Sequence, residues 1–156
     1  MEFTYPKKVR FSCNKCGLCC GDTELKTRHI LLLKAEAEHI ESKTDLKRID
    51  FSSPYEDKPP YPYEMKKTKE GKCIFFKENR CSIYLLRPII CKFYPFDLKF
   101  DQKSQVYAFD FTLECPSIDN GDTWEKKDFS ELFMLAKQKF ERKESKAAEV
   151  RRPHLR

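Results

Sequence analysis

The chain contains little glycine and no long apolar run. Only 4 of its 156 residues are glycine, and none lies in a G-x-G-x-x-G phosphate-binding pattern. Its uninterrupted apolar stretches, such as residues 30–33, are far shorter than the ~18 residues of a membrane-spanning segment. The first residues, MEFTYPKKVRFSC, have neither the apolar core nor the cleavage site of a secretory signal peptide. We therefore expect a cytoplasmic protein with no membrane segment.

Catalytic side-chain motifs are also missing. The three histidines, His29, His39 and His154, stand in unrelated settings, and we expect the first two to be surface or half-buried residues. The sequence has no nucleophile elbow and no zinc-hydrolase helix motif. It shows no side-chain catalytic constellation, so enzymatic activity stays an open question.

Composition indicates one globular domain with a charged surface, since 40% of the residues are hydrophobic and 36% are charged. We assign residues 1–148 to a cysteine-cluster metal-binding domain and residues 149–156 to a basic C-terminal tail. The net charge is +6, and residues 142–156 hold six Lys or Arg against two Glu. Nucleic-acid binding through the tail is therefore one alternative. Thiolates on metal would offset much of this positive charge.

Cysteine is the chemically informative residue type, with eight in the chain. Four of them fall within FSCNKCGLCCGD, and the other four are isolated along the chain. In a reducing compartment such a pattern favours metal or redox chemistry over structural disulfides. Gly17 can adopt the positive φ that lets a loop turn around a metal. The candidate ligands are Cys13, Cys16, Cys19, Cys20, Cys73, Cys81, Cys91 and Cys115.

Zinc and an iron–sulfur cluster are the two metal centres that fit thiolate ligands. Zinc commonly takes two C-x₂-C pairs from two loops, but the four later cysteines form no such pair. The run C-x₂-C-x₂-C, with Cys115-Pro116 far along the chain, is similar to ferredoxin-type ligation. This favours an iron–sulfur cluster of the 4Fe-4S type, with Zn²⁺ as the alternative. Cys19 and Cys20 are adjacent, so their side chains point apart and whether Cys20 is a ligand stays open.

The pattern of apolar residues predicts an α+β fold, a small irregular metal-stabilised single domain with two β-hairpins and a C-terminal helix. We expect short strands at residues 9–11 and 29–33, and a helix over residues 35–43. Four prolines predict an extended loop over residues 51–63. The hairpins are expected around the turn at residues 77–80 and over residues 96–111. The last helix has capping-box spacing at Asp128 and Glu131, although Thr123 could start it earlier.

Basic residues follow the later cysteines closely. Arg87 and Lys92 flank the segment that holds Cys91, and Pro88 stiffens the chain between them. An anionic thiolate centre favours cations beside it, so we take Arg87 and Lys92 as candidate cofactor-binding residues.

Three segments, FSCNKCGLCC, GKCIFF and CSIYLLRPIICKFYP, resemble the YkgJ-type cysteine cluster family of zinc- or iron-chelating proteins. The resemblance extends from Phe11 to about Pro116 and implies that all eight cysteines belong to the family pattern. Lys92 departs from the family, which often has Arg there. A related cysteine motif occurs in flagellin lysine N-methylases, which use an iron–sulfur cluster with S-adenosylmethionine.

We therefore expect a metal-binding protein, with an iron–sulfur cluster, that acts in redox or electron transfer or as a cofactor accessory to an unidentified protein partner. Two alternatives stay open. One is a zinc-stabilised nucleic-acid or ribosome-binding module, and the other is an S-adenosylmethionine-dependent lysine methylase-like enzyme.

Overall fold

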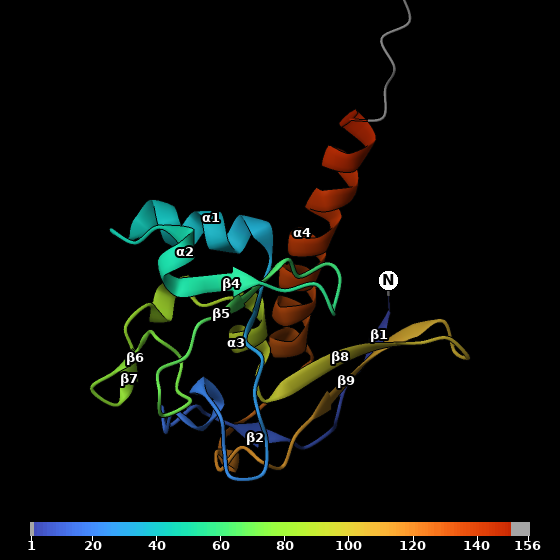
Figure 1. Ribbon diagram of the computed structural model, residues 1–156. Coiled ribbons are helices and arrows are strands. Elements are labelled where there is room, and N and C mark those ends of the chain that lie inside the picture. The colour runs from blue at the N-terminus through green and yellow to red at the C-terminus, as the bar shows by residue number, and fades with distance from the viewer. Residues whose placement is uncertain (1, 151–156) are drawn as a thin grey trace, which may run out of the picture.

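The computed structural model describes the backbone of residues 2–150 and the side chains of residues 2–141 (Figure 1). No helix within residues 2–150 combines the length and the apolar character needed to cross a bilayer. Most of the predicted basic tail, residues 151–156, lies outside the described residues. The elements are, in chain order, β1 (Phe3–Thr4), β2 (Arg10–Phe11), η1 (Leu18–Cys20), β3 (Leu31–Leu32), α1 (Lys34–Lys43), α2 (Arg48–Phe51), β4 (Ser52–Pro54), β5 (Tyr63–Met65), β6 (Phe76–Lys77), β7 (Arg80–Cys81), η2 (Tyr84–Leu86), α3 (Ile89–Phe93), β8 (Phe96–Asp101), β9 (Val106–Phe111), β10 (Ile118–Thr123) and α4 (Lys126–Val150).

The α+β prediction is confirmed, and the segment around residues 30–43 divides as expected into strand β3 and helix α1. Leu32 is fully buried on the strand, and Ala37 and Ile40 are fully buried on the helix. Glu36 is also buried, and its carboxylate accepts the backbone N–H of Leu33 at 3.0 Å. This bond satisfies one of the free N–H groups at the helix start.

Both predicted hairpins form. Strands β8 and β9 pair antiparallel over six residues each, from Phe96↔Phe111 to Asp101↔Val106. The shorter pair β6–β7 turns through Glu78 and Asn79, which have φ values of 51° and 59°. Two positive φ angles are the requirement of a type I′ turn, and asparagine adopts them more readily than most residues.

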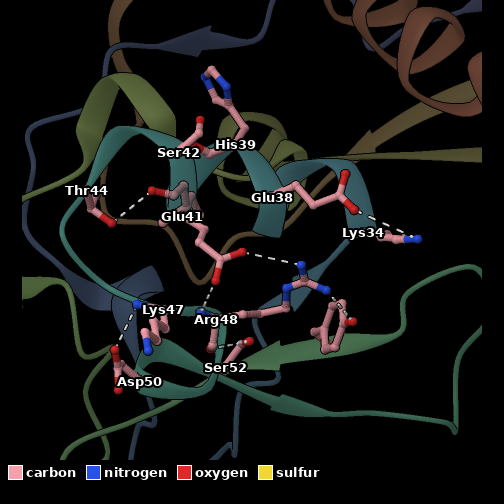
Figure 2. Close-up of polar contacts among 12 residues, drawn as sticks. Lys34, Glu38, His39, Glu41, Ser42, Thr44, Lys47, Arg48, Asp50 and Ser52 are labelled. Carbon is pink, nitrogen blue, oxygen red and sulfur yellow. Dashed lines mark hydrogen bonds and ion pairs between the residues drawn. The ribbon is translucent and has the colours of Figure 1, made fainter.

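The prediction of a loop over residues 51–63 is only partly correct. Its two ends are strands β4 and β5, which pair antiparallel in a third hairpin, and β3 adds to the other side of β5. Helix α2 precedes β4. Arg48 of α2 holds this region together, because its guanidinium donates to Tyr63 Oη at 2.8 Å and to Glu41 of α1 at 3.3 Å (Figure 2). Strands of two or three residues are too short to show an alternating pattern, so the sequence did not reveal them.

The C-terminal helix is confirmed, but its predicted start is wrong. Helix α4 begins at Lys126, and Asp128 accepts the N–H of Glu125 at 2.8 Å from within the first turn. Asp128 is therefore the N3 residue of the cap, and Glu125 takes the N-cap position that the spacing predicts for Asp128. Strand β10, which the sequence analysis did not predict, pairs with β2 just before the helix.

The hydrophobic core has three parts. The first gathers α1, β5 and the β6–β7 hairpin around Phe51 and Phe75. The second gathers β8, β9 and α4 around an aromatic group with Phe129 at its centre. A small third cluster, Leu33, Ile89 and Ala136, joins α3 to α4. The segment of residues 12–22, blue in Figure 1, links the first two parts of the core. It is hydrogen-bonded to Gly71 and Cys73 on one side and to Ser117 on the other.

Candidate metal centre

The cysteine loop, residues 13–20, is shaped by its own backbone. Gly17 has φ 77°, and its carbonyl accepts the N–H of Cys20 at 3.0 Å, which closes the turn into η1. Asn14 accepts the N–H of Cys16 through its side chain at 3.1 Å. The N–H of Lys15 points to Cys13 Sγ at 3.4 Å. The loop thus supplies the turn predicted at Gly17, and its backbone amides lie beside sulfur.

The loop is bound along both sides. On one side, the N–H of Cys73 donates to the carbonyl of Cys20 at 2.6 Å, and the N–H of Asp22 donates to the carbonyl of Gly71 at 2.9 Å. On the other side, the N–H of Asn14 donates to Ser117 Oγ at 3.3 Å. The second end of the loop therefore lies against the segment of Cys73, and the first end lies against the segment that follows Cys115.

The eight cysteines separate into two groups. Four share the first part of the hydrophobic core, and we call them the inner group: Cys20, Cys73, Cys81 and Cys91. Burial raises the pKa of Cys91, and the negative charges of Cys73 and Cys81 within this group, as well as that of Cys19 outside it, raise it further. The hairpin β6–β7 and helix α3 bring these side chains, which are up to 71 residues apart in the sequence, into the first part of the core.

The remaining four form the outer group: Cys13, Cys16, Cys19 and Cys115. Burial raises the pKa of the Cys115 thiol, and the charges of Cys16, Cys13 and Cys19 raise it further. Cys13 and Cys16 are exposed, whereas Cys115 is buried in the second part of the core. Cys19 stands at the junction, because its charge also raises the pKa of Cys73 and of Cys91.

Electrostatics distinguish the two adjacent thiols. A hydrogen bond from the Cys20 side chain lowers the pKa of Cys19 to about 6, with nearby Arg28 and Arg87 adding to the effect. The same hydrogen bond, together with burial, raises the pKa of Cys20. Of the two thiols, Cys19 is therefore the one whose thiolate is favoured, and the thiolate is the form in which cysteine binds metal.

Of the two predicted basic residues, Arg87 is the one whose charge reaches the cysteines within residues 2–141. It lowers the pKa of Cys19 and of Cys91, and its guanidinium lies 3.7 Å from the ring centroid of Tyr84. Lys92 is influenced by other cations instead. Burial lowers the pKa of Lys92, and the positive charges of Lys139 and Arg87 lower it further. A cofactor role for either residue stays a prediction.

Arg28 is a residue that the sequence analysis did not identify. It lies beside Cys19 and its guanidinium contacts Glu114, 86 residues away, at 3.0 Å. No local pattern marks it, since only the folded chain brings Arg28 near Glu114. The adjacency of Glu114 to Cys115 is the one signal that could have suggested a charged partner there.

The donor set of each group fits a thiophilic metal. Each group holds four sulfur atoms, which suit zinc or an iron–sulfur cluster and exclude calcium or magnesium. Among the side chains of residues 2–141, no three Cys, His, Asp or Glu already stand so that they could hold a metal ion. Metal binding therefore requires the thiols of a group to lose their protons and turn toward a common point.

Comparison with known proteins identifies the motif. A family model named CxxCxxCC and described as a "Putative zinc- or iron-chelating domain" matches residues 12–116, which include all eight cysteines. The chain is 31% identical over 123 residues to "Uncharacterized protein MJ0661" of Methanocaldococcus jannaschii, a match that covers 76% of this chain and 63% of that protein. No solved structure matches significantly. By its cysteine loop and the extent of this match, the chain belongs to the CxxCxxCC family of zinc- or iron-chelating domains.

Proposed function

We propose that the chain is an iron–sulfur protein with two four-thiolate centres, one on the inner and one on the outer cysteine group, that serves electron transfer or cofactor assembly. Each group would hold one 4Fe-4S cluster through its four sulfur atoms. A bound cluster would supply one-electron redox chemistry, and the protein would supply the thiolates, their fixed positions and the surrounding charge.

The observation that carries this proposal is the position of Cys115. The N–H of Asn14 donates to Ser117 Oγ, two residues beyond Cys115, at 3.3 Å. Burial raises the pKa of the Cys115 thiol, and the charges of Cys16, Cys13 and Cys19 raise it further. The C-x₂-C-x₂-C run is therefore in electrostatic contact with a remote cysteine that is followed by Pro116. This is the ligand arrangement typical of bacterial ferredoxins. Two of the four thiols are exposed, so a cluster there would lie at the surface, where a protein partner can exchange electrons with it.

The positive charges nearby support an anionic centre. Arg28 and Arg87 both lie close enough to Cys19 to favour its thiolate. A cluster with four thiolates keeps a net negative charge, which neighbouring guanidinium groups stabilise.

Anaerobic purification with elemental analysis tests the proposal. We expect about eight iron and eight sulfide per chain, from two clusters of four each, and a broad visible absorption that bleaches in air. Cys13→Ser and Cys81→Ser form a matched pair, because each removes one ligand from a different group. Each variant should retain about half of the iron of the unmodified chain. Two zinc ions in a colourless protein would refute the cluster, and loss of all metal in both variants would refute two separate centres.

A further inference from the structure

A cavity of about 1000 Å³ opens beside Cys19. It is lined by residues 26–30, 89–91 and 93–99, by Lys58 and Tyr61, and by side chains of residues 107–114 and of helix α4. Cavities that bind small molecules are typically about 300–1,000 Å³ in volume, with mostly apolar walls and a few convergent polar groups. An electron-transfer protein does not need such a space next to its metal centre.

Two buried polar atoms on the cavity wall lack a well-formed partner. Among the side chains of residues 2–141, Arg28 Nε and Tyr94 Oη have no hydrogen-bond partner of good geometry, although both atoms are covered from solvent. Burial raises the pKa of Tyr94, and the Arg28 head group lies close enough to the Tyr94 hydroxyl to lower it against that effect. Buried polar groups are almost always hydrogen-bonded, so two unpartnered donors in one place indicate a missing acceptor. Neither atom is hydrogen-bonded to a cysteine sulfur, although the charge of Cys19 reaches both residues.

Arg28 is held in position from several sides. Its backbone N–H donates to Asp22 at 2.9 Å, its Nη2 contacts Glu114 at 3.0 Å, and its guanidinium carbon lies 5.1 Å from the ring centroid of Tyr94. Its side chain is only 11% exposed. Because its backbone and head group are both bonded, Nε points in a fixed direction, as a preorganised binding group requires.

The charge at this corner favours an anion. Lys26 also contacts Glu114, at 3.8 Å, so two cations share one carboxylate. Elsewhere the wall has an apolar part that includes Ile30, Phe93 and Phe133. It also has charged side chains of both signs: Lys58, Lys99, Lys137, Asp97, Asp110 and Glu141. A ligand that fits has an oxyanion at one end and an apolar body.

We propose that this cavity binds a small organic acid, whose carboxylate or phosphate oxygen accepts hydrogen bonds from Arg28 Nε and Tyr94 Oη. The site is the substrate or effector site of the metal centre, and only that last role rests on the proposed function. Binding itself depends on the cavity and its two donors.

The test uses the full chain, purified anaerobically, with metal content measured in each sample. 3-Phenylpropanoate is the probe and 3-phenylpropanamide is its uncharged control; phenyl phosphate tests the second head group. Calorimetric titration should show about one saturable site for the acids, with the amide at least about tenfold weaker, which is about 1.4 kcal/mol. Saturable binding of only one acid would assign the head group and still support the site.

Variants locate the site. Arg28→Met and Tyr94→Phe should each weaken 3-phenylpropanoate at least about tenfold, and Lys103→Met, in the β8–β9 turn, should leave it unchanged. Tyr94→Phe removes only the hydroxyl, so it remains informative if Arg28→Met fails to fold. Equal affinity of acid and amide, or no effect of Tyr94→Phe, would overturn the proposal.

Metal readouts separate the two proposals. Binding of the probe by metal-free protein would support the site even if the iron–sulfur proposal fails. No binding of either acid by fully metal-loaded protein would overturn the site and leave the metal centre intact. A change in metal spectrum caused by Tyr94→Phe without any change in probe affinity would also overturn it, because the hydroxyl would then serve a sulfur atom.

Discussion

Replacing Glu36 by alanine is expected to destabilise the protein and to loosen the inner cysteine group. Glu36 is buried, and its two oxygens accept the backbone N–H groups of Leu33 at 3.0 Å and of Ile89 at 2.7 Å. Leu33 precedes α1 and Ile89 begins α3, so one carboxylate joins the starts of two helices. Lys139 of α4 adds a contact at 3.7 Å.

The magnitude follows from the two buried donors. A buried N–H left without an acceptor costs about 1–3 kcal/mol, so Glu36→Ala should lower the free energy of unfolding by about 2–6 kcal/mol. Glu36→Gln keeps one acceptor oxygen and should cost less. Because α3 carries Cys91, we also expect the alanine variant to lose metal from the inner group before the outer one.

Anaerobic guanidinium denaturation, followed by circular dichroism at equal metal content, measures the loss. Glu38→Ala is the matched control: it lies on the same helix, is exposed, and contacts only Lys34, at 3.8 Å, among the described ion pairs. Exposed pairs of this kind contribute about 0.3–0.5 kcal/mol. If Glu36→Ala lost no more stability than Glu38→Ala, the bridging role of Glu36 would be refuted.

Two further predictions concern the cysteine loop. Gly17→Ala should reduce the metal content of the outer group and lower the free energy of unfolding by at least about 1–2 kcal/mol. The reason is that Gly17 has φ 77° and an added Cβ would overlap the ring of Phe76. Elemental analysis checks the metal content, and normal loading would contradict the prediction. In metal-free protein, iodoacetamide labelling of Cys19 should rise as the pH passes about 6, since the thiolate reacts and its pKa is lowered mainly by the hydrogen bond from Cys20. Cys20→Ala should move that midpoint upward, as mass spectrometry of the labelled peptides would show, and an unchanged midpoint would rule out the hydrogen bond as its cause.

Sequence alone predicted the elements whose residues lie close together in the chain. Helix α1 and the β8–β9 hairpin follow from local periodicity, and the turn at Glu78 and Asn79 follows from its polar residues. The parallel pairing of β1 with β9 and the pairing of β10 with β2 were not predictable in this way. They depend on contacts across about a hundred residues, and two-residue strands carry no period of their own.

The candidate site divides in the same manner. The loop that holds Cys13, Cys16 and Cys19 is local, so its spacing and Gly17 were sufficient to identify it. The sequence could not assign the later cysteines to the inner or the outer group, because that assignment depends on which part of the core each segment packs against. Arg28 was missed for the same reason, since its contact with Glu114 exists only in the folded chain.

The adjacent pair Cys19-Cys20 explains how one loop can serve two groups. The carbonyl of Cys20 is bound by the N–H of Cys73 at 2.6 Å, which fixes this end of the loop against the inner group. Contrary to the expectation that adjacent side chains point apart, the Cys19 and Cys20 side chains are hydrogen-bonded to each other, and the charge of Cys19 also reaches Cys115. With one residue between them, the two thiols could lie farther apart. Adjacency instead keeps the two groups in electrostatic contact, so that the charge of Cys19 in one group alters the pKa of Cys20 in the other.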